Sequence, residues 1–99
     1  MTASFDQLPD ISMYVDLIEQ FISGSITAAE FEGRFIQQMK AERRTLGEPV
    51  YPILQELFED ADAYVKQPEL RTEPEDLDDE QLLRCAHRAR NSLRDIGIV

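Results

Sequence analysis

The sequence predicts an all-α protein, a compact antiparallel four-helix bundle. Apolar residues recur about every 3.6 residues in four separate segments, which is the pattern of amphipathic helices. Two of these segments begin with a capping box, and no segment shows the two-residue alternation of a strand. A chain of 99 residues has room for one core only. We therefore expect one helical domain over residues 1–99, with helices near 10–23, 27–44, 50–65 and 79–96.

An apolar stripe marks the helix expected over residues 10–23. Spacings of three and four residues place the members of the stripe on one face. The stripe consists of Tyr14, Leu17, Ile18, Phe21 and Ile22. Gly24 ends the helix, because glycine readily adopts the left-handed conformation that follows a helix.

The helix expected over residues 27–44 begins with a capping signal. Thr27 and Glu30 have the spacing of a capping box, in which each side chain binds the backbone N–H of the other residue. The buried face is marked by Phe31, Phe35 and Met39. Gly33 costs about 1 kcal/mol relative to alanine in a helix, and we expect it to let a neighbouring helix pack closely.

The helix expected over residues 50–65 starts after Pro49, because the residue before a proline avoids helical angles. Its core stripe consists of Ile53, Leu54, Leu57, Phe58, Ala61, Tyr64 and Val65. Pro68 and Pro74, set among charged residues, predict a loop.

A second capping box, Asp78 with Gln81, starts the helix expected over residues 79–96. Its core stripe consists of Leu82, Ala86, Ala89, Leu93 and Ile96, and Gly97 ends it.

The net charge restricts the class of partner. Ten basic and twenty acidic residues give −10 at pH 7. A chain this acidic repels phosphates, so we expect no nucleic-acid partner and an attraction to basic protein surfaces. Residues 48–80 hold twelve acidic and two basic residues and carry a charge of −10, whereas residues 1–47 carry −3 and residues 81–99 carry +3.

Two clusters hold most of this negative charge. The first lies on the third predicted helix and consists of Glu56, Glu59, Asp60 and Asp62. Spacings of three and four residues favour one solvent-facing surface for Glu56, Glu59 and Asp60, and the alternative to a binding surface is a merely solvated face. The second cluster consists of Glu73, Glu75, Asp76, Asp78, Asp79 and Glu80. We expect its last three members to cap the fourth helix and to favour its positive end.

The arginines of the fourth predicted helix have two interpretations. They are Arg84, Arg88, Arg90 and Arg94. We expect them mainly to favour the negative C-terminal end of that helix. The alternative is that they neutralise the third helix's acidic residues if the two helices pack together.

No pattern of residues indicates catalysis or a cofactor. Cys85 is the single cysteine, so we expect a buried thiol and no internal disulfide, and His87 is the single histidine. A di-iron bundle needs Glu-x-x-His pairs, which are missing. A calcium loop starting at Asp60 would have Val65 and Arg71 where glycine and glutamate are needed. We expect a protein that is not an enzyme and has no catalytic residue, metal or cofactor.

The sequence also indicates where the protein acts. No apolar run approaches the ~18 residues of a membrane span. The segment Met1–Asp6 lacks the basic and apolar parts of a secretion signal. We expect a cytoplasmic protein with no membrane partner.

Three segments resemble a known family. They are residues 17–31 (LIEQFISGSITAAEF), 53–62 (ILQELFEDAD) and 77–82 (LDDEQL), the last followed by an arginine-rich helix. The chain resembles, over roughly residues 10–95, the colicin D immunity proteins. These small bacterial proteins protect a toxin producer from its own tRNA-cleaving ribonuclease.

The resemblance implies a partner and a binding surface. The partner would be a basic ribonuclease toxin domain, and the protein would be a monomer when free. Acidic side chains of the immunity protein would lie where tRNA phosphates lie in the toxin cleft. Carried over to this sequence, the partner-binding residues would be Glu56, Glu59, Asp60 and Asp62, followed by Glu73, Glu75 and Asp76.

Two other function classes fit the same composition. An acidic adaptor or regulatory subunit would bind another basic protein, such as a transcription factor. A structural homodimer would pair exposed helix faces. A neighbouring toxin gene would favour the immunity protein over the adaptor, and a monomeric mass in solution would count against the homodimer.

Overall fold

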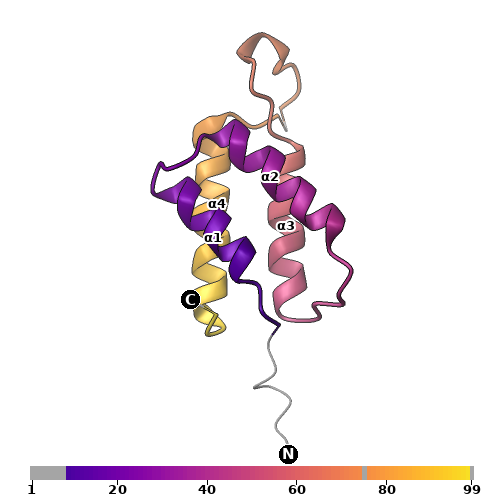
Figure 1. Cartoon of the computed structure of the whole chain (residues 1–99). Coiled ribbons are helices and arrows are strands. Elements are labelled where there is room, and N and C mark those ends of the chain that lie inside the picture. Colours follow the sequence, from indigo (N-terminus) through magenta and orange to yellow (C-terminus); the bar gives the residue numbers. More distant parts are fainter. Residues whose placement is uncertain (1–8, 75, 99) are drawn as a thin grey trace, which may run out of the picture.

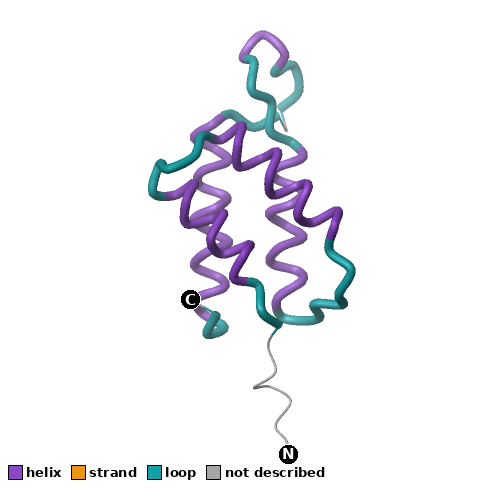
Figure 2. The backbone as a smooth tube through the Cα atoms, viewed as in Figure 1, coloured by secondary structure: helices purple, strands orange, loops and turns teal. Residues whose placement is uncertain are grey.

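The computed structural model of the chain describes residues 9–74 and 76–98. Within them lie four α-helices, α1 (Ser12–Ile22), α2 (Ala28–Ala41), α3 (Val50–Asp62) and α4 (Asp79–Asp95), with a short 3-10 helix, η2 (Pro68–Leu70), between α3 and α4. Successive helices alternate in direction (Figure 1), and helices and loops account for the whole described backbone (Figure 2). Each helix packs on the next, and α4 packs on α1 and also touches α2. The predicted all-α bundle is confirmed.

All four helices contribute to one apolar core. Its largest fully buried side chains are Tyr14, Ile18, Phe31, Phe35, Val50, Leu54, Leu57, Leu82 and Leu93. Aromatic rings join α1 to α2: Phe21 stacks on Phe31 at 4.7 Å between ring centroids, and Tyr14 meets Phe35 edge-on at 5.9 Å. Such pairs add ~0.5–1.5 kcal/mol each to the effect of burial.

Several residues expected in the core lie at its margin instead. They are half-buried and pack against the core from the edges of the stripes: Leu17, Ile22, Met39, Ile53, Phe58 and Ile96. The apolar stripe predicted on each helix is wider than the part of the helix surface that the neighbouring helices cover. Met39 and Phe58 therefore line a groove between α2 and α3.

Both predicted capping boxes are present. Thr27 Oγ1 accepts from the Glu30 N–H at 3.1 Å, and Glu30 Oε1 accepts from the Thr27 N–H at 2.9 Å. At the start of α4, Asp78 Oδ1 accepts from the Gln81 N–H at 2.8 Å, and Gln81 Oε1 accepts from the Asp78 N–H at 2.9 Å. These bonds satisfy backbone donors that a helix start leaves unpaired.

Helix α2 ends three residues earlier than expected. Glu42 is extended, with φ −69° and ψ 123°. Its carboxylate accepts from the Arg44 N–H at 3.1 Å and from Arg44 Nε at 2.8 Å, and it also accepts from the Tyr14 hydroxyl at 2.7 Å. The long-range contact with Tyr14 of α1 therefore helps to hold the end of the helix. The close-packing role expected for Gly33 is wrong, because it is exposed and a Cβ added there would meet no atom within 4 Å.

Helix α3 also ends three residues earlier than expected, and the chain leaves the bundle as an arm of residues 66–76. A closed neck forms the base of the arm: the Val65 N–H donates to the Leu77 carbonyl, and the Leu77 N–H donates to the Ala63 carbonyl, both at 3.0 Å. Arg71 reaches back to the neck, donating from Nε to the Val65 carbonyl at 2.6 Å and from Nη2 to the Lys66 carbonyl at 3.0 Å. The arm extends beyond one end of the bundle (Figure 1).

Candidate interaction surface

The acidic residues of α3 lie at different positions around that helix. Successive residues of a helix are turned by 100°, so the buried residues Leu54, Leu57 and Ala61 form one line along α3, with a flank on each side of it. Glu56 and Asp60 lie on the flank beside α4, and Asp62 lies on the flank toward α2. Glu59 lies almost opposite the buried line, close enough to Asp60 for its charge to contribute to the raised pKa of the Asp60 carboxyl. Of the three acidic residues expected on one face, Glu56 and Glu59 are exposed and Asp60 is half-buried.

The flank beside α4 is partly neutralised. Arg88 Nη1 lies 3.4 Å from Glu56 Oε2, and both side chains are largely exposed. Asp60 is half-buried against the Cys85 thiol, so the expectation that Asp60 faces solvent is wrong. Burial raises the pKa of the Asp60 carboxyl, while Cys85 and Arg88 act in the opposite direction. This flank offers a partner less negative charge than its sequence suggests.

The Cys85 thiol is buried, as expected. Burial and the neighbouring Asp60 carboxylate raise its pKa to about 11. Because the thiolate is the nucleophilic form, both effects suppress reactivity at neutral pH.

Among the described residues, the remaining acidic residues of α3, Glu59 and Asp62, have no arginine partner like that of Glu56. Glu59 and Asp62 are exposed, and Glu59 Oε2 accepts from Gln55 Nε2 at 3.2 Å. Across the seam, Glu32 of α2 lies close enough to Asp62 for the like charge, second to burial, to raise the pKa of Glu32. These three residues, Glu32, Glu59 and Asp62, are named the acidic patch below.

Glu32 was not among the residues predicted at the partner surface. On α2 it is accompanied by one other acidic residue, Glu30, which caps the helix, and its acidic neighbour Asp62 is thirty residues away in the chain. No local clustering of charge signals it. Only the packing of α2 on α3 brings the two carboxylates together.

The acidic residues of the arm have different environments. Glu73 is exposed. Asp76 is half-buried, and its Oδ2 accepts from the Thr72 and Glu73 N–H groups, both at 3.0 Å. Asp76 thus holds the turn of the arm together. Glu75, also expected at the partner surface, lies outside the described residues.

The acidic residues at the start of α4 stabilise that end of the helix. Asp78 caps the helix, and Asp79 and Glu80 lie in its positive first turn, as expected. Asp79 Oδ1 also accepts from the Tyr64 hydroxyl at 2.6 Å. Burial, followed by this carboxylate, raises the pKa of Tyr64 to about 12.

The arginines of α4 mostly meet acidic side chains. Arg84 pairs with Glu80 within α4, Arg88 pairs with Glu56 of α3, and Arg90 pairs with Glu19 of α1, each at 3.4 Å. Only Arg94 lies in the last turn. The main expectation for this group, that it favours the C-terminal end of the helix, therefore holds for Arg94 alone.

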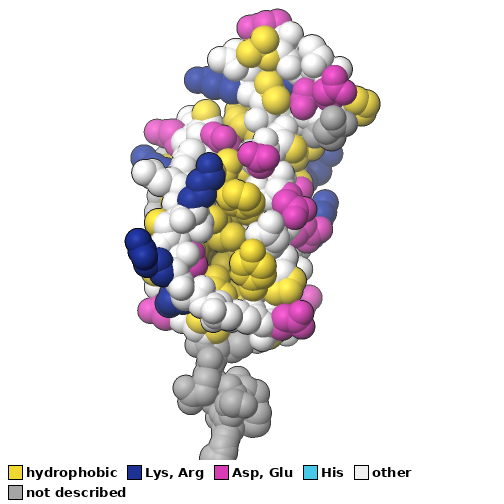
Figure 3. Space-filling view, turned by 90° about the vertical axis from the view of Figure 1, so that its right-hand side faces the viewer, with side chains coloured by type: hydrophobic (Ala, Val, Ile, Leu, Met, Phe, Trp, Pro, Cys, Tyr) yellow, Lys and Arg dark blue, Asp and Glu magenta, His cyan; other side chains and the backbone are white. Residues whose placement is uncertain are grey.

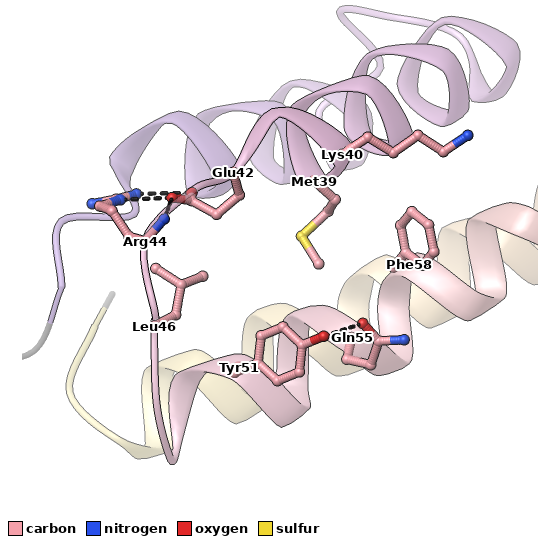
Figure 4. A pocket seen from close by; sticks show the side chains of 8 residues that line it. All are labelled: Met39, Lys40, Glu42, Arg44, Leu46, Tyr51, Gln55 and Phe58. Atoms are coloured by element: carbon pink, nitrogen blue, oxygen red, sulfur yellow. Dashed lines mark hydrogen bonds and ion pairs between the residues drawn. The ribbon is translucent and has the colours of Figure 1, made fainter.

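A groove lies between α2 and α3, next to the acidic patch. Its volume is about 210 Å³. Four apolar or aromatic side chains line it: Met39, Leu46, Tyr51 and Phe58. The polar lining consists of Lys40, Glu42, Arg44 and Gln55. Figure 4 shows Met39 and Phe58 entering the space between the helices and Tyr51 beside Gln55 on α3. This set of residues is named the α2–α3 groove.

Charge differs between the two sides of this face. In Figure 3 a strip of hydrophobic side chains runs along the molecule, with more Lys and Arg on one side and more Asp and Glu on the other, although both signs occur on each side. The Tyr51 hydroxyl donates to Gln55 Oε1 at 2.9 Å, and Gln55 Nε2 donates to Glu59 Oε2. These bonds link the rim of the groove directly to the acidic patch.

Residues 9–74 and 76–98 contain neither a membrane-spanning helix nor a cluster of metal-binding side chains. No helix there is long and apolar enough to cross a membrane. No group of three or more His, Cys, Asp or Glu side chains there is arranged to hold a metal ion.

Comparison with known proteins identifies the family. No curated relative matches the chain. A family model described as bacterial self-protective colicin-like immunity matches residues 10–93, which include α1, α2, α3, all but the last two residues of α4, the acidic patch and the α2–α3 groove. The chain therefore belongs to the bacterial self-protective colicin-like immunity family.

Proposed function

We propose that this protein binds a cognate tRNA-cleaving toxin and neutralises it by covering the toxin's basic substrate cleft with an acidic surface. Membership of the family supports an immunity protein that binds a colicin-type toxin. The observation that carries the finer proposal is the charge of −10 within residues 48–80. A nuclease cleft needs Lys and Arg for phosphate, so an acidic surface complements it.

The surface assigned to this role is the acidic patch, and Glu73 of the arm is assigned a further contact with the toxin. Glu59 and Asp62 are exposed, and Glu32 adds a third carboxylate from another helix. Side chains on helices hold their relative positions better than those on loops. We assign secondary roles to Glu56, which is paired with Arg88, and to Asp60, which is half-buried.

The proposed action needs no chemistry from this chain. The protein acts as a monomeric inhibitor in the cytoplasm and contributes neither a catalytic residue nor a cofactor. Opposite charges on toxin and inhibitor speed their encounter, which suits capture before RNA is cleaved.

A protection assay tests the proposal. Cells express the toxin domain encoded next to this gene, together with the wild-type protein or with Glu59→Lys/Asp62→Lys. We expect the double variant to lose protection and to bind several kcal/mol more weakly, because like charges meet at the contact. Association of the wild type should slow as salt rises, since charge is screened beyond ~8 Å at physiological ionic strength.

The matched control is Asp16→Lys, which reverses an exposed acidic residue on α1. It should protect cells almost as well as the wild type. If the double variant protects cells fully and binds with unchanged affinity, the acidic patch is only a solvated surface. A toxin that cleaves no tRNA would contradict the assigned substrate of the partner.

A further inference from the structure

The α2–α3 groove does not have the properties of a small-molecule site. Its volume of about 210 Å³ is below the range of ~300–1,000 Å³ typical of such sites. It lies between α2, which carries two acidic and two basic residues, and α3, which carries four acidic residues and no basic one. Its size and apolar floor suit one or two side chains of another polypeptide.

Apolar side chains in this groove remain accessible without a partner. Tyr51 is 47% exposed and is one of three large hydrophobic residues exposed among the described residues. Met39 and Phe58 beside it are half-buried. Tyrosine is enriched among the residues that dominate protein interfaces, where an aromatic ring and a hydroxyl are used together.

The groove is continuous with the surface already assigned to the toxin. Tyr51, Gln55 and Glu59 form one hydrogen-bonded row along α3. A partner that covers Glu59 also approaches the ring of Tyr51. On the opposite rim, Lys40 lines the groove from α2.

We propose that the α2–α3 groove receives an apolar side chain of the toxin, flanked by a basic residue that faces Glu59 and an acidic residue that faces Lys40. This inference rests on the proposed function and deepens it. The acidic patch governs the rate of encounter, whereas the groove governs how long the complex lasts. Changes at well-packed apolar contacts act mainly on dissociation, and changes at rim charges act mainly on association.

The first test measures binding rates with the purified toxin domain encoded next to this gene. Tyr51→Ala should raise the dissociation rate at least tenfold and leave the association rate and its salt dependence within twofold. Tyr51→Phe keeps the ring and should retain most of the lifetime of the complex. Met13→Ala, at an exposed methionine of α1, is the matched control and should change neither rate by more than twofold.

The second test is hydroxyl-radical footprinting of the free protein and of the complex, read by mass spectrometry. Met39 and Tyr51 should be oxidised several-fold more slowly in the complex, while Met13 should be oxidised at the same rate in both. Footprinting is done on the wild-type protein, so its result does not depend on whether a variant folds.

The outcomes separate the two proposals. If Glu59→Lys/Asp62→Lys weakens binding while Tyr51→Ala binds like the wild type and Met39 stays unprotected, the groove inference is overturned and the proposed function stands. If the wild-type protein does not bind the toxin, the proposed function fails and the groove inference fails with it. Protection of Met39 in the free protein at concentrations where its mass is dimeric would assign the groove to a second copy and would also overturn the inference.

Discussion

The Asp60 carboxylate lies against the Cys85 thiol where α3 packs on α4. Burial and this negative charge raise the pKa of Cys85 to about 11. Asp60→Asn removes the charge but leaves the burial, so the thiol pKa should fall while remaining above its ordinary value.

The rate of alkylation by iodoacetamide as a function of pH measures this effect in the folded protein. The profile of Asp60→Asn should move to lower pH than that of the wild type. Glu59→Gln, at an exposed position of α3, is the control and should leave the profile in place. An unshifted profile for Asp60→Asn would show that the carboxylate does not act on the thiol.

Glu42 should make the stability of the protein depend on pH in acid. Hydrogen bonds from Arg44, followed by the one from Tyr14, hold the pKa of Glu42 at about 2, against 4.5 for a free side chain. A carboxyl with a depressed pKa stabilises the fold fully above its unfolded pKa, and the effect is lost as pH falls toward the folded pKa. Stability should therefore fall between pH 4.5 and 2.

Urea unfolding at several pH values compares the wild type with Glu42→Gln and Tyr14→Phe. Glu42→Gln should be less stable at pH 7 and should lose less stability between pH 4.5 and 2. Tyr14→Phe, which removes the second of the two partners, should give an intermediate slope. Parallel curves for the wild type and Glu42→Gln would rule out a contribution from this cluster.

Two adjacent residues of α3 should differ in their effect on stability. Leu57 is 1% exposed, so Leu57→Ala should cost ~2–5 kcal/mol of unfolding free energy. Phe58 is half-buried at the groove, so Phe58→Ala should cost less than the ~3–5 kcal/mol of a buried phenylalanine. Denaturant unfolding of both variants provides the comparison. A larger loss for Phe58→Ala than for Leu57→Ala would place Phe58 in the core.

Two glycines should respond in opposite directions to alanine. Gly33 is exposed within α2 and has open space around it, so Gly33→Ala should stabilise the protein by up to about 1 kcal/mol. Gly24 has φ +84°, so Gly24→Ala should cost ~1–2 kcal/mol through backbone strain. Thermal unfolding of the two variants tests both signs. A stabilising Gly24→Ala would contradict the left-handed turn after α1.

Features set by nearby residues could be predicted from the sequence. The two capping boxes need partners only three positions apart, and both form. The four helices follow from periodic apolar residues, and the short connections from α1 to α2 and from α2 to α3 limit the topology. The end of α2 could not be placed, because Glu42 is held partly by Tyr14, which lies 28 positions away in the chain.

The division of the α3 acids was beyond sequence reasoning for a similar reason. Periodicity places Asp60 and Asp62 on the two edges of a polar face, but it does not tell which edge a neighbouring helix covers. Packing of α4 half-buries Asp60, whereas Asp62 stays exposed on the edge toward α2. The sequence contained a weak indication that Tyr51 is exposed, because this aromatic residue lies outside the apolar stripe of its own helix.

Because the neck of the arm is closed, the length and sequence of the arm can change with little effect on the stability of the core. The bonds between Val65 and Leu77 and between Leu77 and Ala63 bring the two ends of the arm together whatever lies between them. The free-energy cost of closing a loop rises by only about 0.6 kcal/mol for each doubling of its length. Insertions in the arm should therefore cost the bundle little, provided that Arg71 keeps its hydrogen bonds to the Val65 and Lys66 carbonyls. A lineage of such proteins can diversify its arm as its targets diverge, while the helices stay the same.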